Sequence, residues 1–121
     1  MEPNKFTKKE AGIYIAAFID GEGSIDRRGN KITIYNSNPA ILEFINGLIE
    51  ILTGYKGRVH QYATPKGKKN FFHLYVTHRM RLFPLLKNIL PFLIDKKEVG
   101  ENVHKLLLNR KNYNSKPSNK K

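Results

Sequence analysis

The stretch "AAFIDGEGSI", residues 16–25, places two carboxylates, Asp20 and Glu22, at the end of an apolar run, each followed by a glycine. The C-terminal end of a helix carries partial negative charge, so a carboxylate there costs about 0.3–1 kcal/mol. Acids are also scarce in this chain, which has 22 Lys and Arg against 10 Asp and Glu and a formal net charge of +12. The position of these two acids therefore calls for a partner that offsets the cost.

Length and composition predict one domain with a conventional core. A chain of 121 residues fits a single domain, and 40% hydrophobic residues supply a core. The absence of cysteine excludes disulfides and thiolate metal sites, and it fits a reducing, intracellular compartment. The start lacks an apolar signal region, so we expect no secretion. The longest apolar stretch, residues 82–94, contains Lys87, Asn88 and two prolines and is too short to cross a membrane.

The basic charge is unevenly placed along the chain. Between Ile51 and Ile94 there are eight Lys or Arg and no acid, and residues 109–121 add five more. A field of one sign attracts polyanions. The alternative is a merely solubilising surface, but this distribution favours a nucleic-acid partner.

A helix is predicted over residues 8–20. Thr7 and Glu10 have the spacing of a capping box, in which each side chain bonds the other's backbone N–H. After its first turn this helix is apolar around most of its circumference, which predicts burial on several sides. Small residues on one face favour close approach of another backbone or ordinary core packing: Gly12, Ala16 and Ala17.

The remaining pattern predicts an α+β fold with an antiparallel sheet. Hairpins are expected at residues 24–35 and 57–77, and helices at 39–53, 79–90 and 95–110. Because helices alternate with hairpins, one face of the sheet should be covered by helices and the other left open. We expect residues 1–111 to form the domain and residues 112–121, which have no apolar pattern, to form a basic flexible tail.

Local signals mark the ends of these elements. Gly29-Asn30 is typical of a two-residue hairpin turn. Asn38 is a candidate N-cap before Pro39, and Gly54 a candidate helix stop. Asp95 is a candidate cap of the last helix.

Alternation along the strands gives the open face basic groups interleaved with rings and hydroxyls, the side chains that read base edges in a major groove. Each position is equally compatible with an ordinary solvated strand, but together they favour a binding face. Lysines in the second hairpin turn, Lys66, Lys68 and Lys69, are expected to contact phosphates. The predicted face carries Arg28, Lys31, Thr33, Tyr35, Arg58, His60, Tyr62, His73 and Tyr75.

The two acids allow three interpretations. A calcium loop is disfavoured, because its required glycine and final glutamate are replaced by Ile25 and Lys31. In a structural interpretation, Asp20 accepts hydrogen bonds from a neighbouring backbone and Glu22 is simply exposed. In a metal interpretation, the acids bind Mg²⁺, which uses one or two carboxylates and takes its other ligands from water and phosphate.

The segment "IAAFIDGEG", residues 15–23, resembles the motif of the LAGLIDADG homing endonucleases. The similarity extends from about Thr7 to Leu108 and includes the capped helix, the following hairpin and "LPFLIDKK" at residues 90–97. Ala17 stands where the motif usually has Gly, and Glu22 replaces its final Asp.

This resemblance implies an αββαββα fold whose saddle-shaped sheet binds double-stranded DNA. With one motif copy, the chain is expected to act as a homodimer, with Gly12, Ala16 and Ala17 at the interface, and to break both strands of a near-palindromic site. The implied cofactor is Mg²⁺ or Mn²⁺, bound by Glu22 and Asp20. The implied catalytic residues are Glu22, Lys96 (or its neighbour Lys97) and Asn38, and Ser24 and Asp26 join the residues expected to contact DNA.

Two alternatives share this fold: a DNA-binding regulator that no longer cuts, and a protein that binds intron RNA and assists its splicing. The resemblance also implies an intron-encoded protein of an organelle (chloroplast or mitochondrion) or of a prokaryotic cytoplasm.

Overall fold

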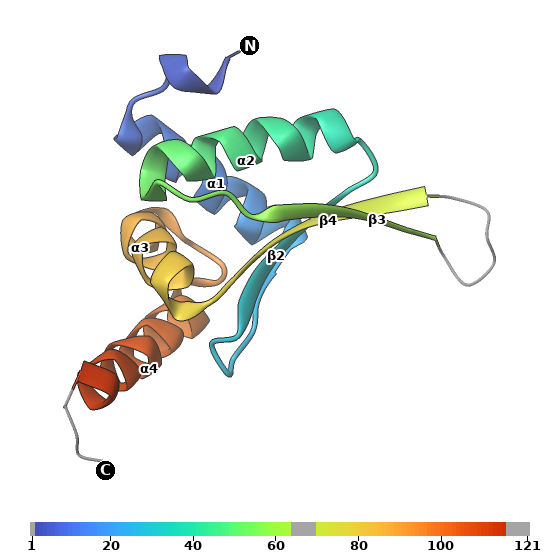
Figure 1. Ribbon diagram of the computed structural model, residues 1–121. Helices are drawn as coiled ribbons and strands as arrows, with labels where there is room; N and C mark the ends of the chain where they lie inside the picture. Colours follow the sequence, from blue (N-terminus) through green and yellow to red (C-terminus); the bar gives the residue numbers. More distant parts are fainter. Residues whose placement is uncertain (1, 64–69, 116–121) are drawn as a thin grey trace.

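The computed structural model describes residues 2–63 and 70–115. For residues 62, 63, 70 and 111–115 it describes the backbone only. Helices and strands alternate as predicted (Figure 1). In chain order the elements are η1 (Pro3–Lys5), α1 (Lys8–Glu22), β1 (Gly23–Ile25), β2 (Lys31–Asn36), α2 (Pro39–Thr53), β3 (Arg58–Ala63), β4 (Asn70–Thr77), α3 (Arg79–Ile89), η2 (Leu90–Phe92) and α4 (Lys97–Ser115).

The capping box at the start of α1 is confirmed. Thr7 Oγ1 accepts a hydrogen bond from Glu10 N at 3.1 Å, and Glu10 Oε1 accepts one from Thr7 N at 2.8 Å. The helix continues past the predicted end at residue 20, because Gly23 N still donates to Ile19 O. Asp20 and Glu22 therefore both lie in the last turn of α1.

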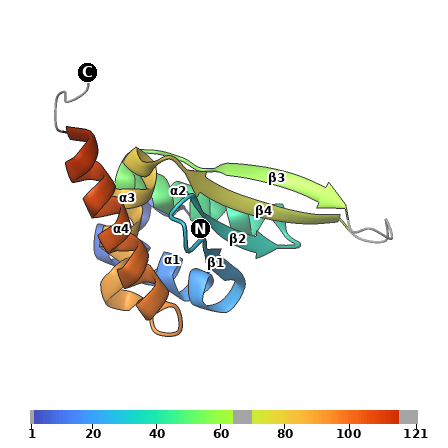
Figure 2. The same ribbon diagram turned by 90° about the horizontal axis from the view of Figure 1, so that it is seen from below.

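The four strands form one antiparallel sheet in the order β1-β2-β4-β3. Helices α1, α2 and α3 contact one face of this sheet, and in Figure 2 the strands lie in front of α2. The opposite face is left open, so the predicted α+β class and its one-sided cover are confirmed.

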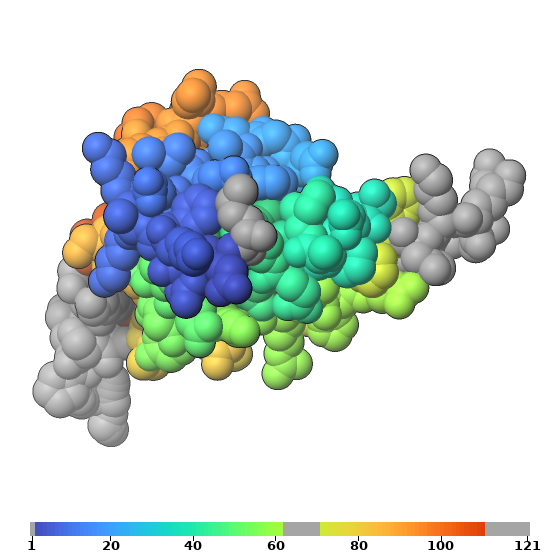
Figure 3. Space-filling view, turned by 90° about the horizontal axis from the view of Figure 1, so that it is seen from above, coloured from blue at the N-terminus to red at the C-terminus, as the bar shows by residue number. Residues whose placement is uncertain are grey.

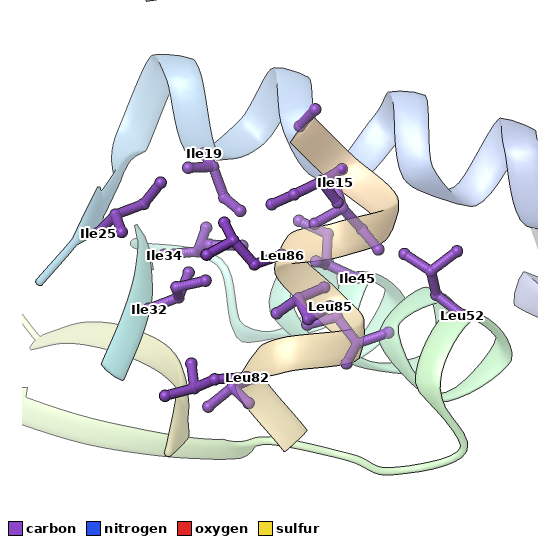
Figure 4. Close-up of a cluster of buried hydrophobic side chains, with 14 of the residues drawn as sticks. Ile15, Ile19, Ile25, Ile32, Ile34, Ile45, Leu52, Leu82, Leu85 and Leu86 are labelled. Carbon is purple, nitrogen blue, oxygen red and sulfur yellow. The ribbon is translucent and has the colours of Figure 1, made fainter. Parts of the chain in front are cut away.

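The core lies between the helices and the covered face of the sheet (Figure 4). Ile15 and Ile19 of α1 meet Ile34 of β2 and Leu85 and Leu86 of α3, all of them buried. Each such side chain contributes about 1.5–3 kcal/mol by leaving water. This packing fixes the axis of α1 and with it the position of its acidic C-terminal end.

The first hairpin differs from its prediction. Strand β1 ends at Ile25, and Arg27 and Arg28 lie in a turn instead of a strand. The turn is longer than two residues: Asp26 N donates to Lys31 O, and the Asp26 carboxylate accepts from Asn30 N at 3.1 Å. Gly29 has φ 76°, a conformation that glycine adopts without strain.

The C-terminal helices also differ in detail. The cap position of α4 belongs to Lys96, whose carbonyl accepts from Gly100 N at 2.9 Å, so Asp95 is not the cap. Helix α4 runs to Ser115, past the boundary predicted at residue 112. The predicted stop of α2 is confirmed, with Gly54 at φ 83°. Among the described residues, no helix has both the length and the apolar character needed to cross a bilayer.

Buried Asn46 anchors α2 to the start of β3. Its Nδ2 donates to Gly57 O at 3.1 Å, and its Oδ1 accepts from Gly57 N at 2.7 Å. Asn46→Leu should lower the free energy of unfolding by about 1–3 kcal/mol, because both backbone groups of Gly57 lose their partner. Asn109→Leu, at an exposed position of α4, should change it by less than about 0.5 kcal/mol. Urea denaturation of both variants measures this, and equal losses would contradict the anchoring role.

Candidate active site and nucleic-acid interface

Asp20 ties the end of α1 to the segment before α4. Its Oδ2 accepts a hydrogen bond from Ile94 N at 2.7 Å, and its Oδ1 accepts one from Lys96 N at 2.9 Å. Lys96 Nζ in turn donates to Asp20 O at 3.0 Å. Figure 3 shows this segment, in orange, lying against α1, in blue. We therefore assign the Asp20 carboxylate a positioning role, as in the structural interpretation of this acid, and the predicted role of Asp20 in metal binding stays a prediction.

Glu22, the last residue of α1, is exposed and is oriented by Asn36. Its Oε1 accepts from Asn36 Nδ2 at 3.2 Å, and Asn36 Oδ1 accepts from Asn38 N at 2.8 Å. Asn38 itself caps α2, because its Oδ1 accepts from Ala40 N at 2.9 Å. The polar side chain that reaches Glu22 is thus Asn36, the last residue of β2, whereas the predicted Asn38 caps α2.

Lys96 brings a positive charge to the end of α1. Its side chain is 22% exposed, donates to Asp20 O and lies 3.5 Å from the Asp95 carboxylate. Lys97 is instead the first residue of α4. A cation at a helix C-terminus is electrostatically favourable. Of the two candidate lysines, the geometry therefore places Lys96 at the site.

Two hollows flank the end of α1. One, of about 430 Å³, is lined by Glu22, Gly23, Tyr35, Asn36, Ser37 and Phe71, so it joins the acid to the open face of the sheet. The other, of about 630 Å³, lies between β1 and α4 and is lined by Lys96, Ser24, Arg27 and Asn102 among others. Glu22 and Lys96 thus each border a concave surface.

Strand register arranges the open face in rows. Ser24, Thr33, Tyr75 and Arg58 form one row across the four strands, and Tyr35, His73 and His60 form the next. Lys31 begins a third row, paired with Thr77. Burial lowers the pKa of His73 below its ordinary value, and His60 and Lys31 lower it further.

Some residues predicted to contact DNA lie elsewhere or are covered. Thr33 is only 3% exposed; it lies in the central strand β2, opposite Tyr75 of β4 and flanked on the same face by Lys31 and Tyr35. Arg28 lies in the turn, where its carbonyl accepts from Arg110 at 2.6 Å. Asp26 holds the same turn through Asn30. Lys66, Lys68, Lys69 and the side chain of Tyr62 lie outside the described residues.

Of the three small residues of α1 predicted at a dimer interface, two are buried within the chain. This corrects the prediction for Gly12 and Ala16. A side chain at Gly12 would meet Asn88 O at 3.0 Å and the Phe92 ring at 3.2 Å. Ala16 is fully buried. Ala17 is exposed, and it lies in line with exposed Ile13 and Gly21 at helical spacing. The exposed stripe of α1 is therefore Ile13, Ala17 and Gly21.

The described residues contain no group of three or more His, Asp or Glu that could enclose a metal ion. Mg²⁺ does not need one, because it commonly binds through one or two carboxylates together with water and substrate phosphates. An exposed carboxylate on the border of a basic surface fits that requirement. Glu22 is the residue that would hold such an ion.

Comparison with known proteins assigns the family. The model of the LAGLIDADG-like domain matches residues 10–89, and the chain belongs to this family. Comparison with curated protein sequences gives no match.

Solved structures share the fold. The homing endonuclease I-CvuI in complex with its target Sro1.3 in the presence of calcium matches with a TM-score of 0.67 and 20% identity, over 88% of this chain and 71% of that chain. I-CvuI with the I-CreI target in the presence of magnesium, with the DNA not cleaved, matches with a TM-score of 0.67 and 19% identity, over 89% and 72%. The chain therefore has the LAGLIDADG homing endonuclease fold.

The different roles of the two acids can be tested by stability. Asp20→Asn should lower the free energy of unfolding by about 1–3 kcal/mol, because an amide has one acceptor oxygen for two backbone N–H groups. Glu22→Gln should leave it within about 0.5 kcal/mol, because Glu22 is exposed. Urea denaturation of both variants measures the difference. A larger loss for Glu22→Gln than for Asp20→Asn would reverse the two assignments.

Proposed function

We propose that the protein is a site-specific DNA endonuclease that makes a metal-dependent double-strand break as a homodimer on a near-palindromic site. One observation carries this proposal. Glu22 is exposed at the end of α1 and oriented by Asn36, close to the loop that holds Lys96, and it borders the open face of the sheet.

The open face supports duplex DNA as the substrate. Lys31 and Arg58 supply positive charge at one end of the face, and rings and hydroxyl groups fill the rest. Cationic groups attract the phosphate backbone, while strand side chains that enter a major groove read base edges. I-CvuI, which shares this fold, was solved in complex with its target and in complex with the I-CreI target DNA.

The chemistry follows from the two charged groups at the end of α1. Bound at Glu22, Mg²⁺ or Mn²⁺ would supply polarisation of the scissile phosphate and activation of a water molecule. Asn36 holds the Glu22 carboxylate in place, and Asp20 fixes the backbone of Lys96. The Lys96 ammonium would stabilise the negative charge that develops on the phosphate in the transition state.

The exposed stripe of α1 supports a homodimer. Ile13 is 44% exposed although it is strongly apolar, and Ala17 and Gly21 beside it are small enough for a second helix to approach closely. A two-fold contact places the same stripe on both copies. Because Glu22 follows Gly21 directly, the two copies of Glu22 would lie near the two-fold axis, as cleavage of both strands requires.

Glu22→Gln should abolish cleavage and preserve binding. A randomised duplex library is incubated with each protein and Mg²⁺, and both cut and retained sequences are determined. Wild type should cut one near-palindromic sequence, and Glu22→Gln should retain that sequence but cut it about 1,000-fold more slowly, because a ligand worth several kcal/mol in the transition state is lost.

Asn36→Ala and Asn38→Ala form a matched pair of controls. Asn36→Ala should slow cleavage about tenfold, because it releases the metal-binding carboxylate. It should also lower stability by up to about 1 kcal/mol, because Asn38 N loses its partner. Asn38→Ala should lower stability by about 1 kcal/mol as a lost N-cap and leave the cleavage rate of folded protein unchanged. If wild type and Glu22→Gln retain the same duplex and neither cuts, the protein is a DNA-binding regulator. Preference for intron RNA over every duplex would instead select an RNA-binding role.

Ala17→Glu should convert the dimer into a folded monomer, because two like charges would face each other across the two-fold axis. Leu108→Glu, which changes a 40% exposed leucine on α4, is the matched control and should remain dimeric. Sedimentation equilibrium measures the mass, and circular dichroism checks the fold. A dimeric Ala17→Glu variant would exclude the α1 stripe as the interface.

A further inference from the structure

The centre of the open face holds two stacked imidazoles that the cleavage chemistry does not use. The His60 and His73 ring centroids lie 5.9 Å apart, and the ring planes differ by 10°. These residues are direct partners in the β3–β4 register, and Tyr35 of β2 completes the row at 6.2 Å from His73. Tyr75 lies 5.3 Å from each imidazole. The pair is therefore built into the sheet by register and ring packing.

The cationic groups around the pair disfavour a positive charge on the His73 ring. Lys31 on β2 and Arg58 on β3 face it from one end of the sheet, together with the titratable phenols of Tyr35 and Tyr75. Glu22 lies beyond Tyr35, at the end of α1, and Asp26 is held in the first turn. Among these described groups, Lys31 and the partner imidazole act on His73 in the same direction as its burial, so the His73 ring stays neutral at neutral pH.

Protonation changes what an imidazole recognises. A neutral ring has one donor and one acceptor nitrogen, whereas a protonated ring has two donors. Each base pair shows its own pattern of donors and acceptors in the major groove. A neutral ring can bond to a donor or an acceptor on a base edge, whereas a protonated ring can bond only to acceptors and so loses the contact to a donor. The charged form instead strengthens attraction to phosphates regardless of sequence.

We propose that the His60–His73 pair reads base edges in its uncharged form, with exposed His60 making the contact, so that acidification raises affinity for DNA of unrelated sequence and thereby lowers sequence discrimination. This inference rests on the proposed binding of duplex DNA by the sheet. The pair is a specificity-determining element, separate from Glu22 and Lys96. The sign follows from linkage: a polyanion favours the protonated rings, so binding takes up protons and tightens as pH falls.

The test compares two duplexes across pH. The duplex selected at pH 8 with Glu22→Gln and a scrambled duplex of equal length are titrated at pH 8 and pH 5.5, in Ca²⁺ and at constant ionic strength. Affinity for the scrambled duplex should rise about tenfold at pH 5.5, and the ratio of the two affinities should fall about tenfold.

Three variants in the Glu22→Gln background assign the effect. His60→Gln replaces the contacting ring, and the double variant His60→Gln/His73→Gln replaces both rings, by an amide that keeps a donor and an acceptor at every pH. The change of the affinity ratio with pH should therefore shrink in His60→Gln and vanish in the double variant. His78→Asn is the matched control, because His78 is exposed outside the rows of the open face and Asn tolerates its φ of 73°. It should behave like its parent.

The outcomes separate this inference from the proposed function. A ratio that stays constant for the parent, or that still falls in the double variant His60→Gln/His73→Gln, would overturn the inference and leave sequence-specific DNA binding intact. Failure to select any duplex at pH 8 would overturn both.

Discussion

The Asp20 carboxylate, held by the backbone amides of Ile94 and Lys96, is the contact on which the rest of the site depends. It joins the end of α1 to a segment 74 residues further along the chain. Carboxylate bonds to backbone N–H groups are charge-assisted and strong, and the Lys96 ammonium adds a cation at the same helix end. Together they offset the cost of two acids in the last turn of α1. They also bring Lys96 to the helix end that carries Glu22.

Because of this contact, the two acids at the end of α1 have different roles. Asp20 points toward the segment before α4 and is satisfied by the protein, whereas Glu22 points toward β2 and stays exposed beside Asn36. Gly23 permits the chain to turn directly from helix to strand, since a side chain there would meet the backbone of Ile19 at 2.7 Å and Thr33 O at 2.9 Å. The motif therefore encodes both a structural clamp and a chemical group within four residues.

What could be predicted from the sequence is what depends on near neighbours. The Thr7–Glu10 capping box, the Gly54 stop and the exposure of Lys31 and Tyr35 on the open face depend on local patterns, and each was predicted correctly. Strand β1 was predicted too long, because the hold of Asp26 on Asn30 competes with strand pairing. That Asn36 and not Asn38 contacts Glu22 depends on how β2 is placed against the end of α1. The relative placement of segments that are distant in sequence cannot be predicted from either segment alone.

Gly12 and Ala16, two of the three residues predicted at a dimer interface, are buried within the chain for a similar reason. Gly12 allows close approach of another segment, as predicted, but that segment belongs to the same chain and contributes Asn88 and Phe92. Only tertiary packing decides which small residues of a helix face inward. Once this packing is known, the candidate interface becomes the exposed side of α1, formed by Ile13, Ala17 and Gly21.

The most direct test of the site is to map the metal on the protein itself. The protein bound to its selected duplex is loaded with Fe²⁺ in place of Mg²⁺, and ascorbate and peroxide are added so that hydroxyl radicals cut the nearby polypeptide. Cuts should fall at residues 20–24 and near Asn36 and Lys96, and Glu22→Gln should remove them. Cuts that persist in Glu22→Gln, or that centre on His60 and His73, would contradict a metal site at the end of α1.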